Sequence, residues 1–160
     1  MKKFLCTFLI FFIHNLHAVK IGDIAPNFKA STTIGDLTFH EWANESWIVL
    51  FSHPGDFTPV CTTELASVAQ LQPEFNKRKV KVIALSGDSV KDHQEWIPHI
   101  NSFKDTLKRE GSLLSMINNW KEDTDINYPI IADEDFSIST LYGMYHPNAM
   151  PNSNSLGTLN

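Results

Sequence analysis

Three apolar runs of strand length alternate with segments of helical spacing, and this alternation restricts the possible folds more than any other feature. The runs are WIVLFS (47–52), VKVIALS (80–86) and YPIIAD (128–133). Continuous apolar runs of this length are typical of strands buried on both faces of a sheet. Strands that alternate with helices predict an α/β fold with a mainly parallel sheet, and a chain of 160 residues is typical of one domain.

Helices are predicted between and after these runs, at residues 63–78, 88–103 and 136–144. Pro73 should kink or shorten the first helix, and Pro98 should interrupt the second. Ser89 is a favourable N-cap for the second helix, with Asp92 three residues later. Residues 22–42 are rich in turn formers and predict a short hairpin or an extended arm.

The composition indicates a folded globular protein without a nucleic-acid surface. Hydrophobic residues make up 42% of the chain, charged residues make up 19%, and the net charge is −5. A disordered chain would be less hydrophobic, and a nucleic-acid-binding domain would carry a basic stripe or patch. Nucleic acid is therefore not an expected partner.

The N-terminus has the pattern of an export signal. Two lysines precede an apolar core at residues 4–13, and a cleavage site follows Ala18, as in secretory signals. The core is too short for a stable membrane span. We therefore expect residues 1–18 to be a signal peptide and residues 19–160 to form the domain, in the periplasm or outside the cell. The alternative is an uncleaved anchor, or a misassigned start codon on a cytoplasmic protein.

Cys61 lies in the polar junction SHPGDFTPVCTTE, whereas a cysteine used for packing usually has apolar neighbours. Thr58 can cap a helix whose first residue is Pro59. Cys61 then lies in the first turn, where unpaired N–H groups and the positive end of the helix dipole favour the nucleophilic thiolate. Pro54 and Pro59 would stiffen the loop. The Thr58 hydroxyl can face the sulfur, and His53 can add a hydrogen-bond donor.

Spacing tests the other kinds of cysteine chemistry. Thioredoxin-type exchange needs a second cysteine three residues on, where this chain has Glu64, and a cysteine phosphatase needs an arginine six residues on, where it has Ser67. No local signature supports a papain-like protease, and the scattered histidines have no recognisable zinc spacing. A reactive redox or nucleophilic cysteine is therefore favoured over a structural one. The remaining histidines, namely His93, His99 and His146, are interpreted as surface groups.

Four segments carry a resemblance to a known family: GDIAPNF (22–28), FSHPGDFTPVCTTEL (51–65), VIALSGDSVKDH (82–93) and YPIIAD (128–133). They resemble the peroxiredoxins, specifically the one-cysteine, peroxiredoxin-six-like branch. The likeness extends from about Lys20 to Pro147, and its central motif is Pro54-x-x-x-Thr58-x-x-Cys61. The resemblance implies a thioredoxin-like fold with a central mixed sheet flanked by helices.

The resemblance also implies a peroxidase that reduces hydrogen peroxide and organic hydroperoxides in antioxidant defence. Cys61 would be the peroxidatic cysteine, whose thiolate attacks the peroxide and becomes a sulfenic acid. Thr58 would hydrogen-bond the peroxide and the sulfur, and Pro54 would shield the site. His53 matches the branch's active-site histidine. Glu64 matches an acidic residue near the site, or is simply a first-turn helix carboxylate. With no second cysteine after the signal, a small thiol or a thiol protein must restore the cysteine. The resemblance implies no metal or organic cofactor. It does imply a homodimer.

The chain departs from the family near its end. Peroxiredoxins hold the thiolate with an arginine on a strand that follows the loop corresponding to residues 146–160, and neither Arg78 nor Arg109 matches it. We therefore expect a product truncated at the C-terminus, without the last strands and the last large helix. Losing such a donor lowers a rate by about 10²–10³-fold, so we expect weak activity and poor stability. The alternative function is an inactive remnant with a chaperone-like role or none.

A second activity of some members of this branch is a phospholipase-like hydrolysis that uses His, Ser and Asp. His40 and Ser46 stand at the corresponding positions. The aspartate would lie beyond Asn160, and the glycines that flank a nucleophile elbow are missing. Such a pair more often caps a turn beside a strand, so the lipase-like site is the weaker prediction.

Overall fold

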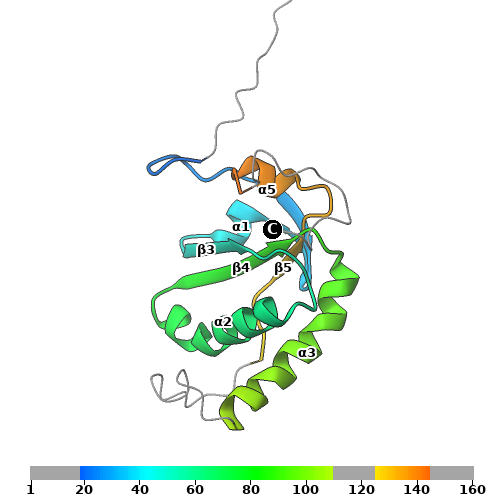
Figure 1. The fold of residues 1–160 in the computed structure, drawn as a ribbon. Helices are drawn as coiled ribbons and strands as arrows, with labels where there is room; N and C mark the ends of the chain where they lie inside the picture. Colours follow the sequence, from blue (N-terminus) through cyan, green and yellow to red (C-terminus); the bar gives the residue numbers. More distant parts are fainter. Residues whose placement is uncertain (1–18, 110–124, 145–160) are drawn as a thin grey trace, which may run out of the picture.

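The computed structural model describes residues 19–109 and 125–144 (Figure 1). In chain order the elements are β1 (Lys29–Thr32), β2 (Gly35–Thr38), α1 (Phe39–Ala43), β3 (Trp47–Ser52), α2 (Pro59–Lys77), β4 (Val80–Ser86), α3 (Val90–Arg109), β5 (Ile130–Ala132) and α5 (Ser137–Leu141). The strands of these described segments form one sheet in the order β2-β1-β5-β4-β3.

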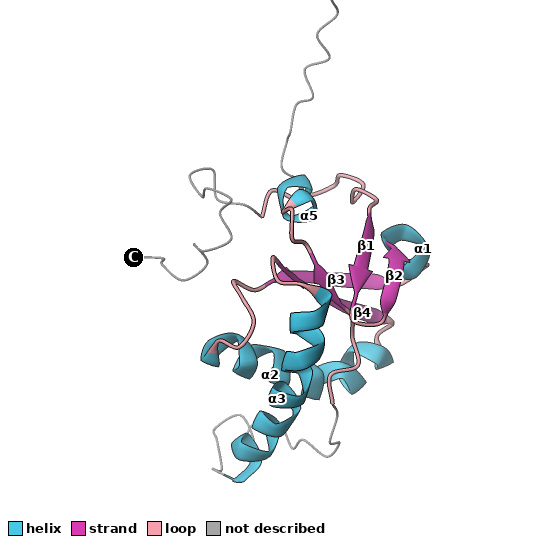
Figure 2. Cartoon of the chain, turned by 90° about the vertical axis from the view of Figure 1, so that its right-hand side faces the viewer, coloured by secondary structure: helices cyan, strands magenta, loops and turns pink. Residues whose placement is uncertain are grey.

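The sheet is mixed. Strands β3, β4 and β5 are parallel to one another, whereas β1 runs antiparallel to both β2 and β5. The helices α2 and α3 make the crossover connections that parallel neighbours need. This arrangement confirms the predicted α/β, thioredoxin-like fold, and the β1–β2 pair confirms the predicted hairpin (Figure 2).

Helices cover both faces of the sheet because successive side chains of a strand point to opposite sides. In β4, Val82 and Ala84 pack in the core beneath α2 and α3, whereas Ile83 and Leu85 pack in the core beneath α1 and α5. All four residues are at most 2% exposed. Figures 1 and 2 show α2 and α3 on one side of the sheet and α5 on the other. β4 therefore contributes fully buried side chains to both cores.

The prediction that residues 47–52 are buried on both faces is wrong. Among the described strands, β3 is an edge strand, hydrogen-bonded to β4 alone. Trp47 is 78% exposed and Val49 is 39% exposed, whereas Ile48 and Leu50 pack against the core beneath α1 and α5. Partly buried and exposed residues therefore alternate along most of this strand, which is covered mainly on one face, although nearly all of its residues are apolar.

The two helix-interior prolines do not end their helices. α2 continues through Pro73 to Lys77, and α3 continues through Pro98 to Arg109, so Pro73 does not shorten the first helix and Pro98 does not interrupt the second. A proline removes one helical hydrogen bond and strains the preceding turn. Around Pro98, the fully buried Trp96 and Ile100 anchor the helix on both sides of this defect. The free energy gained by burying Trp96 and Ile100 outweighs the tendency of Pro98 to break the helix.

Side chains cap the starts of two helices. The Ser89 hydroxyl donates to Asp92 Oδ2 at 2.6 Å and accepts from the Asp92 N–H at 3.2 Å, which confirms Ser89 as the cap of α3. At α5, the buried carboxylate of Asp133 accepts from the N–H groups of Ile138 and Ser139 at 2.9 and 2.8 Å, and from the Ser139 hydroxyl at 2.6 Å.

Two predictions concern residues outside the described segments. The signal peptide at residues 1–18 is one, and the loop at residues 146–160 with the end of the predicted domain is the other. Within the described segments, no helix combines the length and the apolarity that crossing a bilayer would require.

Candidate active site

Cys61 is the third residue of α2 and lies below the surface. It is 2% exposed and its thiol is free. The Thr62 N–H donates to the Thr58 carbonyl at 2.9 Å and makes the first helical hydrogen bond. The N–H groups of Val60 and Cys61 precede this bond, so they lie at the positive end of the helix dipole without a helical acceptor. The predicted first-turn position of Cys61 is confirmed.

The spatial neighbours of Cys61 are apolar, although its sequence neighbours are polar. Cys61 belongs to the core cluster that includes Leu65 of α2, Trp96 of α3 and Ile130 of β5. The loop before α2 turns the cysteine into this core. A site of this kind excludes water from the sulfur, and charge–dipole interactions are stronger there than in water.

Thr58 holds the loop and does not cap the helix with its side chain. It occupies the N-cap position with extended backbone angles, but no side-chain capping hydrogen bond is formed. Its hydroxyl instead donates to the Gly55 carbonyl at 3.1 Å. The preceding Phe57 has a φ of 56°, a left-handed conformation that is uncommon for a residue with a side chain. The predicted position of Thr58 is therefore confirmed, and the predicted capping hydrogen bond is wrong.

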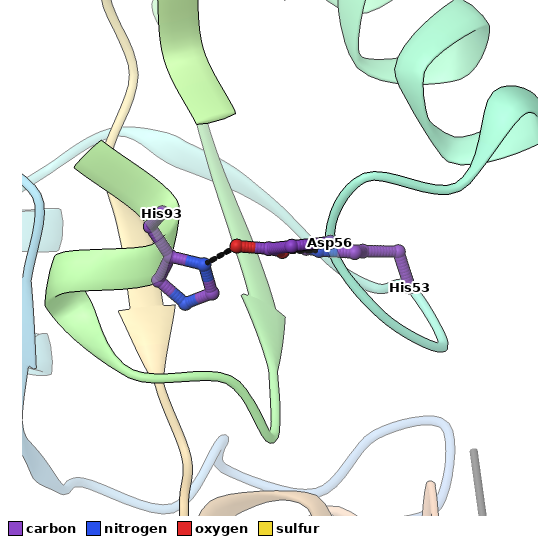
Figure 3. Close-up of side chains that lie close together, drawn as sticks. All are labelled: His53, Asp56 and His93. Carbon is purple, nitrogen blue, oxygen red and sulfur yellow. Dashed lines mark hydrogen bonds and ion pairs between the residues drawn. The ribbon is translucent and has the colours of Figure 1, made fainter. Parts of the chain in front are cut away.

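His53, Asp56 and His93 form a buried hydrogen-bonded chain beside this loop. His53 Nε2 lies 2.9 Å from Asp56 Oδ1, and His93 Nδ1 lies 2.6 Å from Asp56 Oδ2. The side chains are 1%, 2% and 0% exposed, respectively. Figure 3 shows Asp56 between the two histidines, with one histidine on each side of its carboxylate.

The surroundings of Asp56 favour its charged form. Burial is the largest influence and raises the pKa of its carboxyl, but hydrogen bonds from His53 and His93, together with electrostatic attraction from the two histidines, outweigh it. The pKa of Asp56 therefore lies below its ordinary value. Its backbone N–H also donates to Asp88 Oδ2 at 2.9 Å, and the Ser86 hydroxyl donates to the same oxygen at 2.8 Å. These bonds tie the loop to the carboxyl end of β4.

The same three side chains are also metal-ligand types. Across residues 19–109 and 125–144, they are the only group of three or more His, Cys, Asp or Glu whose donor atoms lie within 4.8 Å of one another. Two histidines and one carboxylate can bind a transition metal. Here each histidine faces a different oxygen of Asp56 at hydrogen-bond distance, so direct hydrogen bonds account for the arrangement.

The interpretation of His93 as a surface group is wrong. His93 is 0% exposed, and its Nε2 lies 3.1 Å from the Ile131 carbonyl of β5. A signal was present in the sequence, because His93, Trp96 and Ile100 share one face of a helix at spacings of three and four. Asp56 had no such signal, since it lies in an irregular loop and meets His93 only through the fold. By contrast, His99 is exposed, as expected.

The other predicted residues lie apart from the buried chain. Pro54 is exposed, and Glu64 is an exposed residue beyond the first turn of α2, so the interpretation of Glu64 as a first-turn carboxylate is wrong. His40 Nε2 donates to the Ala25 carbonyl at 2.8 Å, and the Ser46 N–H donates to the Ala43 carbonyl at 3.1 Å. No hydrogen bond joins His40 to Ser46 in the described structure. Each is engaged with nearby backbone.

An open surface hollow of about 620 Å³ lies on another part of the molecule. It is lined by residues of β1, β2 and α1, including Lys29, Asp36 and Trp42, and by none of the Cys61 loop. Volume therefore does not identify the site in this molecule. The buried thiol of Cys61 and the hydrogen-bonded chain of His53, Asp56 and His93 identify it instead.

Comparison with known sequences gives a consistent family assignment. A profile of the AhpC/TSA family matches residues 21–156. The 1-Cys peroxiredoxin of Dictyostelium discoideum is 45% identical over 131 residues, and peroxiredoxin-6 of Homo sapiens is 48% identical over 128 residues. These matches cover 82% and 79% of this chain, but 47% and 50% of the relatives. The chain thus spans about half the length of the curated relatives that it matches.

Solved structures give the same result for the fold. A yeast mitochondrial 1-Cys peroxiredoxin aligns with a TM-score of 0.68 at 39% identity, over 86% of this chain and 56% of that one. A cysteine-to-serine mutant of the peroxiredoxin 6 of Arenicola marina aligns with a TM-score of 0.65 at 45% identity, over 82% of this chain and 53% of that one.

Proposed function

The chain belongs to the AhpC/TSA family and groups with the one-cysteine peroxiredoxins, and from this premise we propose that it is a thiol-dependent peroxidase that uses Cys61. The observation that carries the proposal is the position of the thiol. Cys61 is free, buried and in the first turn of α2. Backbone N–H groups at such a position stabilise a thiolate and the negative charge that develops on an attacked oxygen.

In the proposed reaction, the Cys61 thiolate attacks the terminal oxygen of a hydroperoxide. An S–O bond forms while the O–O bond breaks, so the sulfur is oxidised to a sulfenic acid and the peroxide is reduced to an alkoxide or hydroxide. The leaving oxygen takes up one proton and departs as an alcohol or water. One external thiol then forms a mixed disulfide with Cys61 and releases water, and a second thiol restores the free cysteine.

The loop residues have supporting roles in this proposal. The Thr58 hydroxyl can rotate from the Gly55 carbonyl to hydrogen-bond the peroxide and the sulfur, because a hydroxyl is both donor and acceptor. Pro54 lies on the exposed side of the loop and would limit access to the sulfur. His53 would contact the peroxide. Glu64 is exposed, so it would act only through its contribution to the electrostatic potential at the surface.

The reductant, the assembly and the location are further parts of the proposal. The thiol of the yeast mitochondrial 1-Cys peroxiredoxin is resolved via glutathione and thioredoxin systems, and by analogy we propose a small thiol or a thiol protein here. We propose a homodimer, in line with the resemblance to the branch. Export is proposed from the pattern of residues 1–18.

The test is direct detection of the oxidised sulfur. The expressed chain is reduced, treated with one equivalent of hydrogen peroxide and reacted with a sulfenic-acid probe, and the modified peptide is identified by mass spectrometry. We expect labelling at Cys61, peroxide consumption in the presence of a thiol, and neither in Cys61→Ser. A folded chain, as judged by circular dichroism, that consumes no peroxide and takes up no label would favour the inactive remnant.

A further inference from the structure

We propose that Asp56 and His93 are positioning residues that hold His53 as its Nε2–H tautomer, so that the buried Nδ1 of His53 accepts a hydrogen bond from the hydroperoxide O–H. The first half of this inference concerns protons in the folded protein and stands by itself. The second half rests on the proposed peroxidase function. The protons can be assigned one after another along the chain of three side chains.

The hydrogen bonds of His93 determine which of its ring nitrogens carry a proton. Its Nε2 lies 3.1 Å from the Ile131 carbonyl, which can only accept, so Nε2 carries a hydrogen. Its Nδ1 lies 2.6 Å from Asp56 Oδ2, and a hydrogen must lie between these two atoms. The low pKa of Asp56 places that hydrogen on His93. His93 is then an imidazolium paired with a carboxylate, which is the kind of pair that makes short, charge-assisted hydrogen bonds.

The second proton follows from the charge on Asp56. An ionised carboxylate accepts hydrogen bonds and donates none. His53 Nε2 lies 2.9 Å from Asp56 Oδ1, so this nitrogen must be the protonated one. The Asp56 N–H is also fixed, because it donates to Asp88 Oδ2 at 2.9 Å. The carboxylate therefore cannot turn freely to release either histidine.

The remaining nitrogen of His53 has no partner. Across the described residues, His53 Nδ1 is a buried atom without a hydrogen bond. A proton on Nδ1 would be a buried donor with no acceptor, and it would also leave His53 positively charged inside the protein. His53 is therefore neutral, and its Nδ1 presents a lone pair. Buried unpaired polar atoms are rare in proteins, and a catalytic role is one of the reasons for which they occur.

The location of His53 connects this lone pair to the thiol. His53 follows the carboxyl end of β3, and Cys61 lies in the first turn of the next helix. Trp96 links the two parts of the site: its ring centroid lies 5.3 Å from that of His53, and it is a member of the same core cluster as Cys61. Its Nε1–H donates to Thr62 Oγ1 at 3.2 Å. A hydroperoxide that approaches the sulfur along this loop can donate its O–H to His53.

The experiment combines a spectroscopic and a kinetic measurement. Two-bond ¹⁵N–¹H NMR correlations of the uniformly labelled chain distinguish a protonated ring nitrogen from a bare one. The single-turnover rate of Cys61 oxidation by hydrogen peroxide is measured by quenching and mass spectrometry. We expect a protonated Nε2 and a bare Nδ1 on His53, and two protonated nitrogens on His93.

Two variants change the proton donor or acceptor with little change in shape. In Asp56→Asn, the amide can donate to His53 Nε2, so we expect His53 to move toward the Nδ1–H tautomer and oxidation to slow by about 10²-fold. His93→Gln retains a donor for Asp56, and we expect it to keep the tautomer and most of the rate that His93→Leu loses. His99→Gln is the matched control, because His99 is on the same helix but exposed, and it should leave both measurements unchanged.

The outcomes separate the two proposals. A wild-type His53 that carries its proton on Nδ1, or on both nitrogens, overturns the inference whether or not Cys61 reacts. A switched tautomer in Asp56→Asn with an unchanged oxidation rate overturns the role of Nδ1 and leaves the peroxidase intact. Failure of wild-type Cys61 to react, with the expected tautomer, refutes the peroxidase and supports only the proton assignment. Stoichiometric retention of Zn²⁺ by all three side chains after dialysis would also overturn the inference.

Discussion

Tyr128 is expected to stabilise the fold in a way that depends on pH. It is 3% exposed, and its hydroxyl donates to the Leu65 carbonyl of α2 at 2.9 Å. Tyr128→Phe removes this bond and little volume. The Leu65 carbonyl lies inside α2, where a helical N–H also bonds it, so no acceptor is left unpaired. The expected loss at pH 8 is therefore about 1 kcal/mol, the usual net value of a neutral hydrogen bond.

Alkaline pH should remove this advantage. Burial raises the pKa of Tyr128 well above its ordinary value of 10.0, so the phenol stays protonated in the folded protein when the unfolded chain has released its proton. The unfolded state then binds fewer protons, and the free energy of unfolding falls as pH rises above 10. The decrease is about 1.4 kcal/mol per pH unit. The phenylalanine variant lacks this decrease, so the two proteins should be equally stable near pH 11.

The assay is urea denaturation of both proteins at pH 8 and pH 11, monitored by circular dichroism. Other titrating groups are common to both proteins and cancel in the difference. Tyr142→Phe is the matched control: burial raises the pKa of Tyr142 to about 12, but this residue is more accessible, and its effect should be smaller. A stability difference for Tyr128→Phe that is the same at both pH values would refute the reasoning.

Substitutions at three further positions test the hydrogen bonds that hold α2, α3 and α5. Asp133→Ala should lower the free energy of unfolding by about 3 kcal/mol, because three donors at the start of α5 lose their buried acceptor; Asp133→Asn should lose less in the same urea titration. Ser89→Ala should lose about 1 kcal/mol as an N-cap of α3, and an unchanged midpoint would contradict that role. Thr62→Val should lose about 1–3 kcal/mol by leaving the buried Trp96 N–H without its acceptor, and a shifted tryptophan emission should accompany the loss.

Local features of the chain were predictable from the sequence. The alternation of apolar runs with helical segments predicted the order of strands and helices, and the Thr-Pro pair before Cys61 predicted the start of α2. These features depend on residues that are close together in the chain, where φ preferences, side-chain period and capping act. The capping of α3 by Ser89 is predictable for the same reason.

The tertiary structure alone decided which polar groups meet and which strand lies at an edge. Parallel strands bring their carboxyl ends to one side of the sheet, and the loops after β3 and β4 therefore bring Asp56 beside Asp88 and His93. No sequence spacing encodes this meeting, because all of α2 and β4 lies between Asp56 and the other two residues. The exposure of Trp47 is likewise a matter of pairing, since an apolar strand is buried only where neighbouring elements cover it. Short-range preferences placed the thiol on its helix, and long-range packing supplied the buried histidine chain beside it.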